Sequence, residues 1–143
     1  MEVIGFFIKE MCSKREETIQ FPVSINNKTA IKEIEEIEVK TIGKKCLKVC
    51  FEFKTEYLHQ KKKMGEIKIS GHMLFIHEDH KKILNSWKKK KTLPEDVNVF
   101  LINHVLRKCI TKSVSIAEDL ALPSPIPLPV ARIQKKTETK YIA

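Results

Sequence analysis

The stretch from Leu47 to Lys54 alternates without exception between apolar and mostly charged residues. Because successive side chains of a β-strand point to opposite faces, this pattern predicts a strand with one face in the core and the other in water. A shift of one residue would expose the whole apolar face, so the phase is strongly specified. The side chains expected to point inward are Leu47, Val49, Phe51 and Phe53, and those expected to point outward are Lys48, Glu52 and Lys54.

A second alternating stretch follows a polar loop at His59–Lys63 and predicts a further strand. Leu74 and Ile76 interrupt its alternation. We therefore expect the far end of this strand to be buried on both faces or to meet another chain. Its inward positions are Ile67, Ile69, Gly71, Met73 and Phe75.

Three weaker strand signals come earlier in the chain. The apolar run Val3–Ile8 predicts a strand that is buried on both faces. The alternation over residues 21–25 predicts a short strand, and Asn26–Asn27 predicts a turn after it. The isoleucines that follow fit a helix as well as a strand. We favour a strand over Glu33–Ile42, because Gly43–Lys44 supplies a hairpin turn into the next strand.

The last third of the chain has helical periodicity. Ile83, Leu84 and Trp87 predict a short helix, and Thr92–Glu95 fits a capping box at the start of a long one. Pro123 is expected to end the long helix. Its apolar stripe comprises Ile102, Val105, Leu106, Cys109, Ser113, Ile116, Ala117 and Leu120.

Strands followed by helices predict an α+β fold, with an antiparallel four-stranded sheet followed by one short and one long C-terminal helix. We expect a single domain over residues 1–132 and a flexible polar tail over residues 133–143. Proline at alternate positions forces the exit at residues 122–130 to be extended. Its apolar side chains suggest that it lies against the body of the protein or a neighbouring subunit.

The composition indicates a cytoplasmic protein. The start, MEVIGFFIKE, lacks the features of a signal peptide, and no segment reaches the ~18 consecutive apolar residues of a membrane helix. We therefore expect no membrane insertion and four reduced cysteines. The formal net charge of +9 favours acidic partners such as nucleic acid, although lysine runs are also common in solvated loops and helix ends.

The sequence has no recognisable catalytic motif, neither a glycine-rich phosphate loop nor a G-x-S-x-G nucleophile elbow. Cys46 and Cys50 would lie about 13 Å apart on an extended strand, which is too far to share a metal ion. His77 and His80 could approach each other at a helix start, but surface histidines are the better interpretation. We expect no enzymatic activity, no cofactor and no metal site.

Several segments resemble, in order and spacing, the SecB-like family of protein-export chaperones. The resemblance extends over roughly Phe6 to Val130. The helix piece Val105–Thr111 is similar to an Ala-Arg-Glu-Cys-Ile-Thr stretch of the bacterial members, and the proline-rich exit is similar to theirs. The segments that resemble strands of the family are Phe6–Met11, Pro22–Ile25, Glu36–Thr41 and Gly65–Ile76.

The resemblance implies a SecB-like fold, binding of unfolded polypeptide and a tetramer built as a dimer of dimers. Without the resemblance, the apolar surface of the strands requires only one further subunit to cover it, which predicts a homodimer. The bacterial members are acidic and contact a basic export motor through an acidic face. This chain is basic and ends in a lysine-containing segment instead of an acidic tail. Coupling to that motor is therefore not implied.

We expect a chaperone that binds unfolded or non-native polypeptides as a homo-oligomer and that could assist protein export. Val23 and Ile25 match positions that resemble the family's client-groove strand, and Ile126 and Leu128 could line the same groove. Ordinary core packing is an equally good interpretation of Val23 and Ile25, and Ile126 and Leu128 could simply cover the core. The alternative function is a basic nucleic-acid-binding module.

Overall fold

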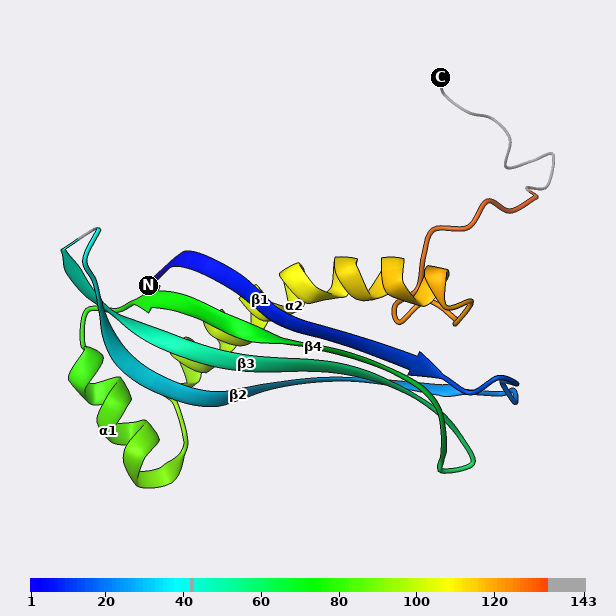
Figure 1. Cartoon of the computed structure of the whole chain (residues 1–143), viewed down its shortest axis with the longest axis horizontal. Helices are drawn as coiled ribbons and strands as arrows, with labels where there is room; N and C mark the ends of the chain where they lie inside the picture. The colour runs from blue at the N-terminus through cyan, green and yellow to red at the C-terminus, as the bar shows by residue number, and fades with distance from the viewer. Residues whose placement is uncertain (42, 134–143) are drawn as a thin grey trace, which may run out of the picture.

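The computed structural model describes residues 1–41 and 43–133. One antiparallel sheet has the strand order β1-β4-β3-β2, so β1 and β2 form its two edges. Helix α2 crosses one face of the sheet, and α1 lies beside β2 (Figure 1). This arrangement confirms the predicted fold class. The elements are β1 (Glu2–Arg15), β2 (Ser24–Val39), β3 (Lys44–His59), β4 (Lys62–Ile76), α1 (His80–Lys90) and α2 (Glu95–Asp119).

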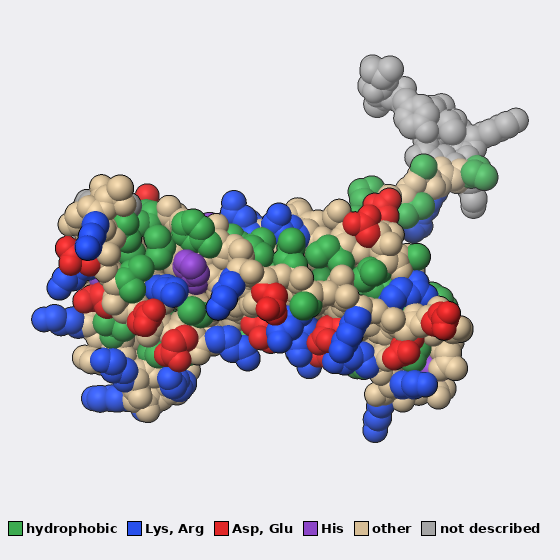
Figure 2. All heavy atoms as spheres, in the orientation of Figure 1, with side chains coloured by type: hydrophobic (Ala, Val, Ile, Leu, Met, Phe, Trp, Pro, Cys, Tyr) green, Lys and Arg blue, Asp and Glu red, His purple; other side chains and the backbone are tan. Residues whose placement is uncertain are grey.

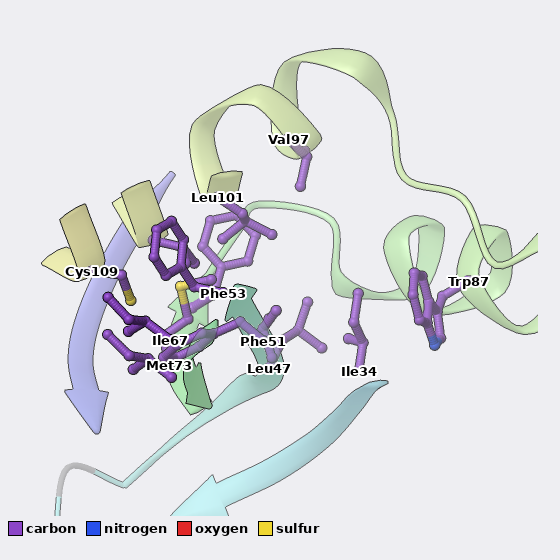
Figure 3. Packing of buried hydrophobic residues seen from close by; sticks show 14 of the residues in the cluster. Ile34, Leu47, Phe51, Phe53, Ile67, Met73, Trp87, Val97, Leu101 and Cys109 are labelled. Carbon is purple, nitrogen blue, oxygen red and sulfur yellow. The ribbon is translucent and has the colours of Figure 1, made fainter. Parts of the chain in front are cut away.

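The predicted phases of β3 and β4 are confirmed. The inward residues of β3 are at most 1% exposed, and the alternate residues lie half-buried on the opposite face. Phe51 and Phe53 of β3, Ile67 of β4, and Leu101 and Cys109 of α2 pack into one cluster (Figure 3). The core therefore lies between the sheet and α2.

Strand β2 is continuous where two shorter strands were expected, and the predicted turn at Asn26–Asn27 is wrong. Asn27 pairs with Thr55 of β3, whose Oγ1 donates a hydrogen bond of 2.7 Å to Asn27 Oδ1. The amide side chain thus bonds across the ladder instead of closing a local turn. The strand favoured over Glu33–Ile42 is confirmed as far as Val39, and Ile42 lies outside the described residues.

Strand β1 continues to Arg15, well past the apolar run that predicted it. Within a single chain Val3–Ile8 is not buried on both faces, because Phe7 is 49% exposed. The helices cover only the opposite face of the sheet, to which Phe6 and Ile8 contribute half-buried side chains.

The turns at the two ends of β3 are tight. Gly43 has φ +66 and its N–H bonds to Val39 O at 2.9 Å, which closes the predicted hairpin between β2 and β3. The loop expected at His59–Lys63 is shorter than predicted and consists of a turn at Gln60 and Lys61. Their φ values of 48 and 69 suit a two-residue hairpin.

The predicted capping box at Thr92–Glu95 is wrong. Pro94 is the N-cap of α2 with φ −52 and ψ 142, and no side chain caps the helix. This extended proline leaves Thr92 two residues before the cap, where its hydroxyl does not cap the first turn. The acidic Glu95 and Asp96 in the first turn interact favourably with the positive end of the helix dipole instead.

Helix α2 buries a stripe with a spacing of four residues, which contains Leu101 in place of the predicted Ile102. It ends at Asp119, and the N–H of Leu122 returns to Ala117 O at 2.8 Å. Neither described helix is long and apolar enough to cross a membrane. The buried residues of the stripe are Val97, Leu101, Val105, Cys109, Ser113 and Ala117.

The face of the sheet away from α2 carries a balanced ladder of charges across β2, β3 and β4. Figure 2 shows lysine and acidic side chains alternating there, with hydrophobic side chains gathered where β1 lies. Lys28 and Lys63 both approach the Glu56 carboxylate, at 3.2 and 3.6 Å. The hydrogen bond from Lys28 lowers the pKa of Glu56. The further pairs are Lys48–Glu35, Lys54–Glu66, Lys63–Glu66 and Lys68–Glu52.

Candidate functional site

The candidate site lies at the end of the sheet where the chain crosses from β1 to β2. The crossover begins with a bond of 2.8 Å from Glu16 N–H to Met64 O at the start of β4. It ends with a contact of 2.8 Å between His59 Nδ1 and Pro22 O. These two anchors hold the crossover against the β3–β4 hairpin and position the first residues of β2.

The proline-rich exit is anchored at the same end of the sheet. The Tyr57 hydroxyl donates a hydrogen bond to Pro123 O, and Asn27 Nδ2 donates one of 3.0 Å to Pro125 O. Tyr57 and Pro125 are buried, and both hydrogen bonds are partly buried. Burial raises the pKa of Tyr57 to about 12. Beyond Pro127 the chain leaves the body of the protein (Figure 1).

The predicted site residues lie on these two segments. Val23 and Ile25 are half-buried and pack against the core, with Ile25 opposite Tyr57. Ile126 is half-buried and Leu128 is 50% exposed. The bond from Asn27 to Pro125 therefore brings the start of β2 and the exit together. Half-burial of Val23 and Ile25 is compatible both with a groove and with core packing, so their role stays a prediction.

Two features of this end were missed in the sequence. Phe21 is 65% exposed on the crossover, and Val130 is 73% exposed at the end of the exit. The alternation over residues 21–25 had placed Phe21 in a strand, whereas β2 begins only at Ser24. The following Pro22 was the available signal, because proline interrupts a ladder and is common where strands begin.

A shallow hollow of about 450 Å³ lies further along the free edge of β2. Ala30 and Ile31 of the strand form one side, and Trp87, Leu93 and Ile102 of the helical region form the other. Two contacts hold the Trp87 side chain in place. Its ring centroid lies 5.2 Å from Lys91 Nζ, and its Nε1 donates a hydrogen bond of 3.4 Å to Glu33 Oε1. Thr29, Lys91, Thr92 and Asn98 also line the hollow, so its surface is mixed polar and apolar. An exposed strand edge beside such a hollow can accept an added strand.

Among the described residues, burial changes the pKa of several titratable groups. Burial raises the pKa of the Cys109 thiol to about 11, which keeps it protonated and unreactive near neutral pH. Burial also lowers the pKa of His104 and of His72. Within residues 1–41 and 43–133, no group of three histidine, cysteine, aspartate or glutamate side chains could hold a metal ion.

The anchor at Tyr57 gives a testable pH dependence. Because an unfolded phenol ionises near pH 10 and the folded one near 12, deprotonation favours the unfolded chain. The stability from Tyr57 is thus present below about pH 10 and lost as the pH rises toward 12. Tyr57→Phe should lower the unfolding free energy at pH 7 by about 1–2 kcal/mol, because it leaves Pro123 O without its donor.

Urea unfolding of both proteins at neutral and alkaline pH measures this effect. The stability of Tyr57→Phe should fall less steeply above pH 10 than that of the unchanged protein. Parallel pH profiles would show that the phenol is not held in its neutral form by the fold.

The chain has a SecB-like fold. It is similar to a SecB-like chaperone of Mycobacterium tuberculosis, solved in complex with a ChAD peptide from the HigA1 antitoxin, with a TM-score of 0.53 and 8% sequence identity. The likeness covers 93% of this chain and 92% of that chain. No family model and no curated protein matches the sequence.

Proposed function

We propose that this protein is a chaperone that holds unfolded or non-native polypeptides. The observation that carries the proposal is exposed apolar surface on extended segments at one end of the sheet, where Phe21 is 65% and Leu128 50% exposed. Soluble proteins rarely expose an apolar patch unless another molecule binds to it. Exposed apolar side chains at one end of the sheet therefore indicate a binding site. The solved relative of the same fold binds a peptide, which is in line with this proposal.

An extended client would use two kinds of contact. The free edge of β2 offers unpaired backbone groups, and a client strand could pair with them. The half-buried Val23 and Ile25, with Ile126 and Leu128 from the exit, would supply apolar contacts to alternate client side chains. Because backbone pairing does not depend on sequence, such a site would accept many clients.

The double substitution Val23→Ser, Ile25→Ser tests the site. It should weaken protection of a denatured client from aggregation, while urea unfolding and solution mass remain near those of the unchanged protein. Val99→Ser is the matched control, because Val99 is 51% exposed on α2, far along the chain from the crossover and the exit. Unfolding of the double variant would show that both residues belong to the core. Undiminished client protection in a folded double variant would overturn the site.

We also propose a homo-oligomer, a dimer or a tetramer, that covers apolar side chains on the face away from α2. Phe7 lies on that face with its ring 5.1 Å from His72, and the half-buried Leu74 lies opposite Gly5 there. A second subunit is the simplest cover for such a surface. Light scattering at micromolar concentration should give a mass above that of one chain, and a clean monomer would overturn the proposal.

We propose that the chaperone acts in the cytoplasm, where protein export is one pathway that it could assist. Client holding that rests on apolar burial should tolerate moderate salt and have a negative heat-capacity change. Binding to RNA that weakens steeply with salt, without protection of any client, would favour a nucleic-acid-binding module instead.

A further inference from the structure

Helix α1 has the highest density of positive charge among the helices and strands of the protein. Five of its eleven residues are lysine, a sixth lysine is its C-cap, and no acidic residue lies between His80 and Pro94. All six are exposed, and Figure 2 shows basic side chains projecting at the end of the molecule where α1 lies. We call them the α1 lysines. They are Lys81, Lys82, Lys88, Lys89, Lys90 and Lys91.

The stability of the helix accounts for only some of the α1 lysines. Cations in the last turn interact favourably with the negative end of the helix dipole, which suits the three lysines there. Lys81 and Lys82 lie in the first turn, where the dipole favours acidic side chains, and that turn contains none. The N-cap Asp79 accepts a hydrogen bond of 3.1 Å from Lys82 N–H at its Oδ1. The two cations of the first turn therefore weaken the helix, which indicates a role outside it.

The carboxylates of β2 that lie against α1 leave most of the α1 lysines unpaired. Glu33 Oε1 lies 3.8 Å from Lys91 Nζ and accepts the hydrogen bond of Trp87 Nε1. Glu36 Oε2 lies 3.4 Å from His80 Nδ1. Among the ion pairs of the described residues, Lys91 is the one α1 lysine that takes part. The lysines of the sheet, in contrast, pair with glutamates of the neighbouring strands.

The outer surface of α1 presents charge without an apolar anchor. Ile83 and Trp87 are buried in the core, and Leu84 packs against it. Of the large hydrophobic side chains that are exposed in the described part of the chain, none belongs to α1. Protein partners bind mainly through buried aromatic and aliphatic anchors, and membrane-surface helices need an exposed apolar face. A partner of α1 is therefore recognised by its negative charge.

We propose that α1 is a docking site for double-helical RNA, which it holds by the phosphate backbone. Lys82 and Lys89 are seven residues apart, so they project from the same side of the helix at a distance of about 10 Å along its axis. Lys81 and Lys88 repeat this spacing one residue earlier. A double helix has about twice the phosphate density of a single strand. Because α1 exposes no aromatic ring on which an unpaired base could stack, it favours the duplex.

The choice of RNA as the source of these phosphates rests on the cytoplasmic setting proposed above. The docking site itself is separate from the client site. α1 follows the end of β4 at Ile76, whereas the crossover is anchored at Met64, near the start of β4 (Figure 1). At about 3.3 Å per residue, these two positions are roughly 40 Å apart. RNA on α1 would therefore leave the crossover and the exit free to hold a client.

The probe is a fluorescent RNA duplex of about twenty base pairs, titrated with the full chain over a range of salt concentrations. Lys82→Gln, Lys89→Gln should weaken binding by about tenfold or more and lower the salt slope by about two, because each lysine that leaves a phosphate lowers it by about one. Lys61→Gln, Lys62→Gln makes the same change in net charge at exposed positions of the β3–β4 hairpin and should have little effect. Equal losses in the two variants would reduce the effect to net charge and overturn the site.

Other anionic partners are distinguished by further probes. A DNA duplex of the same sequence should bind no more tightly than the RNA duplex, and tighter binding would overturn the choice of RNA. An oligouridylate that binds more tightly than the duplex would overturn recognition of a double helix. Polyglutamate or phosphatidylglycerol vesicles that bind as tightly as the duplex, with the same loss in Lys82→Gln, Lys89→Gln, would assign α1 to an acidic protein or a membrane and equally overturn the proposal.

The outcome is separable from that of the client-holding site. Lys82→Gln, Lys89→Gln should protect a denatured client as well as the unchanged protein does, and Val23→Ser, Ile25→Ser should bind the RNA duplex normally. Client protection without RNA binding would overturn the docking site and leave the chaperone proposal intact. Loss of client protection in Lys82→Gln, Lys89→Gln would place α1 in the client site and overturn its separate role.

Discussion

We expect Phe51→Ala to lower the free energy of unfolding by about 3–5 kcal/mol. Phe51 is 1% exposed and stacks on Phe6 at 4.8 Å, so its removal leaves a cavity between β1, β3 and α2. Because whole domains are stable by only about 5–15 kcal/mol, this loss is a large share of the total. Urea unfolding followed by circular dichroism measures it.

The matched control is Phe21→Ala, which removes the same atoms from a side chain that is 65% exposed. Surface substitutions of this kind change stability by about 0.5 kcal/mol or less. A loss well under 1 kcal/mol for Phe51→Ala would contradict the assigned phase of β3, since a phenylalanine on the wet face would behave like Phe21.

The second large effect concerns the close approach of β1 to β4. A Cβ placed on Gly71 would meet the carbonyl oxygen of Phe7 at 2.0 Å and the Cα of Ile8 at 2.9 Å. Both are backbone atoms, which cannot rotate away as a side chain can. Gly71→Ala should therefore push the edge strand off the sheet and cost about 3 kcal/mol or more. Hydrogen exchange should show the loss of protection concentrated in β1.

Gly65→Ala is the control at the other end of the same strand pair. Its Cβ would meet Leu122 Cδ1 at 3.1 Å and Lys14 O at 3.4 Å, and the leucine side chain can shift to make room. We expect a smaller loss of stability, of about 1 kcal/mol. Similar losses for the two glycine variants would show that the approach at Gly71 is not tighter than that at Gly65.

The sequence was most informative where side chains alone decide the structure. The strict alternation around Phe51 and Ile69 fixes which face is buried, whatever the neighbouring strands are, and both strands have the predicted phase. The hairpin at Gly43 was also predictable, because its positive φ suits glycine. These features depend on residues close together in the chain.

Other elements depend on partners that are distant in the sequence. Asn27 lies within a strand because Thr55 and Pro125 satisfy its amide, and neither residue is near it in the chain. The capping-box motif at Thr92 is overridden by the extended conformation of Pro94. In the first case a tertiary contact overrides the local preference of the sequence for a turn. In the second case the backbone conformation overrides its preference for a capping box.

The sequence predicted which segments form the candidate site. It did not predict how exposed their individual side chains are. The apolar residues of the exit indicated that it contacts the body, and the bonds from Tyr57 and Asn27 confirm this as far as Pro125. The exposure of Phe21 and the hollow beside the edge of β2 were not predictable. Both depend on where the crossover and α2 lie in space, which no periodicity in the sequence encodes.

The strand order has a consequence for the synthesis of this protein. β1 is synthesised before the other three strands, but among the described residues it pairs with β4 alone, and even the nearest pair, Arg15 and Gly65, is separated by roughly fifty residues. At translation rates of about 5–20 residues per second, this strand waits several seconds for its partner. During that time Phe6, Ile8 and Met11 remain uncovered on the nascent chain. Aggregation of stalled or truncated chains should therefore begin in this segment, and chains that stop before Gly65 should be the most affected.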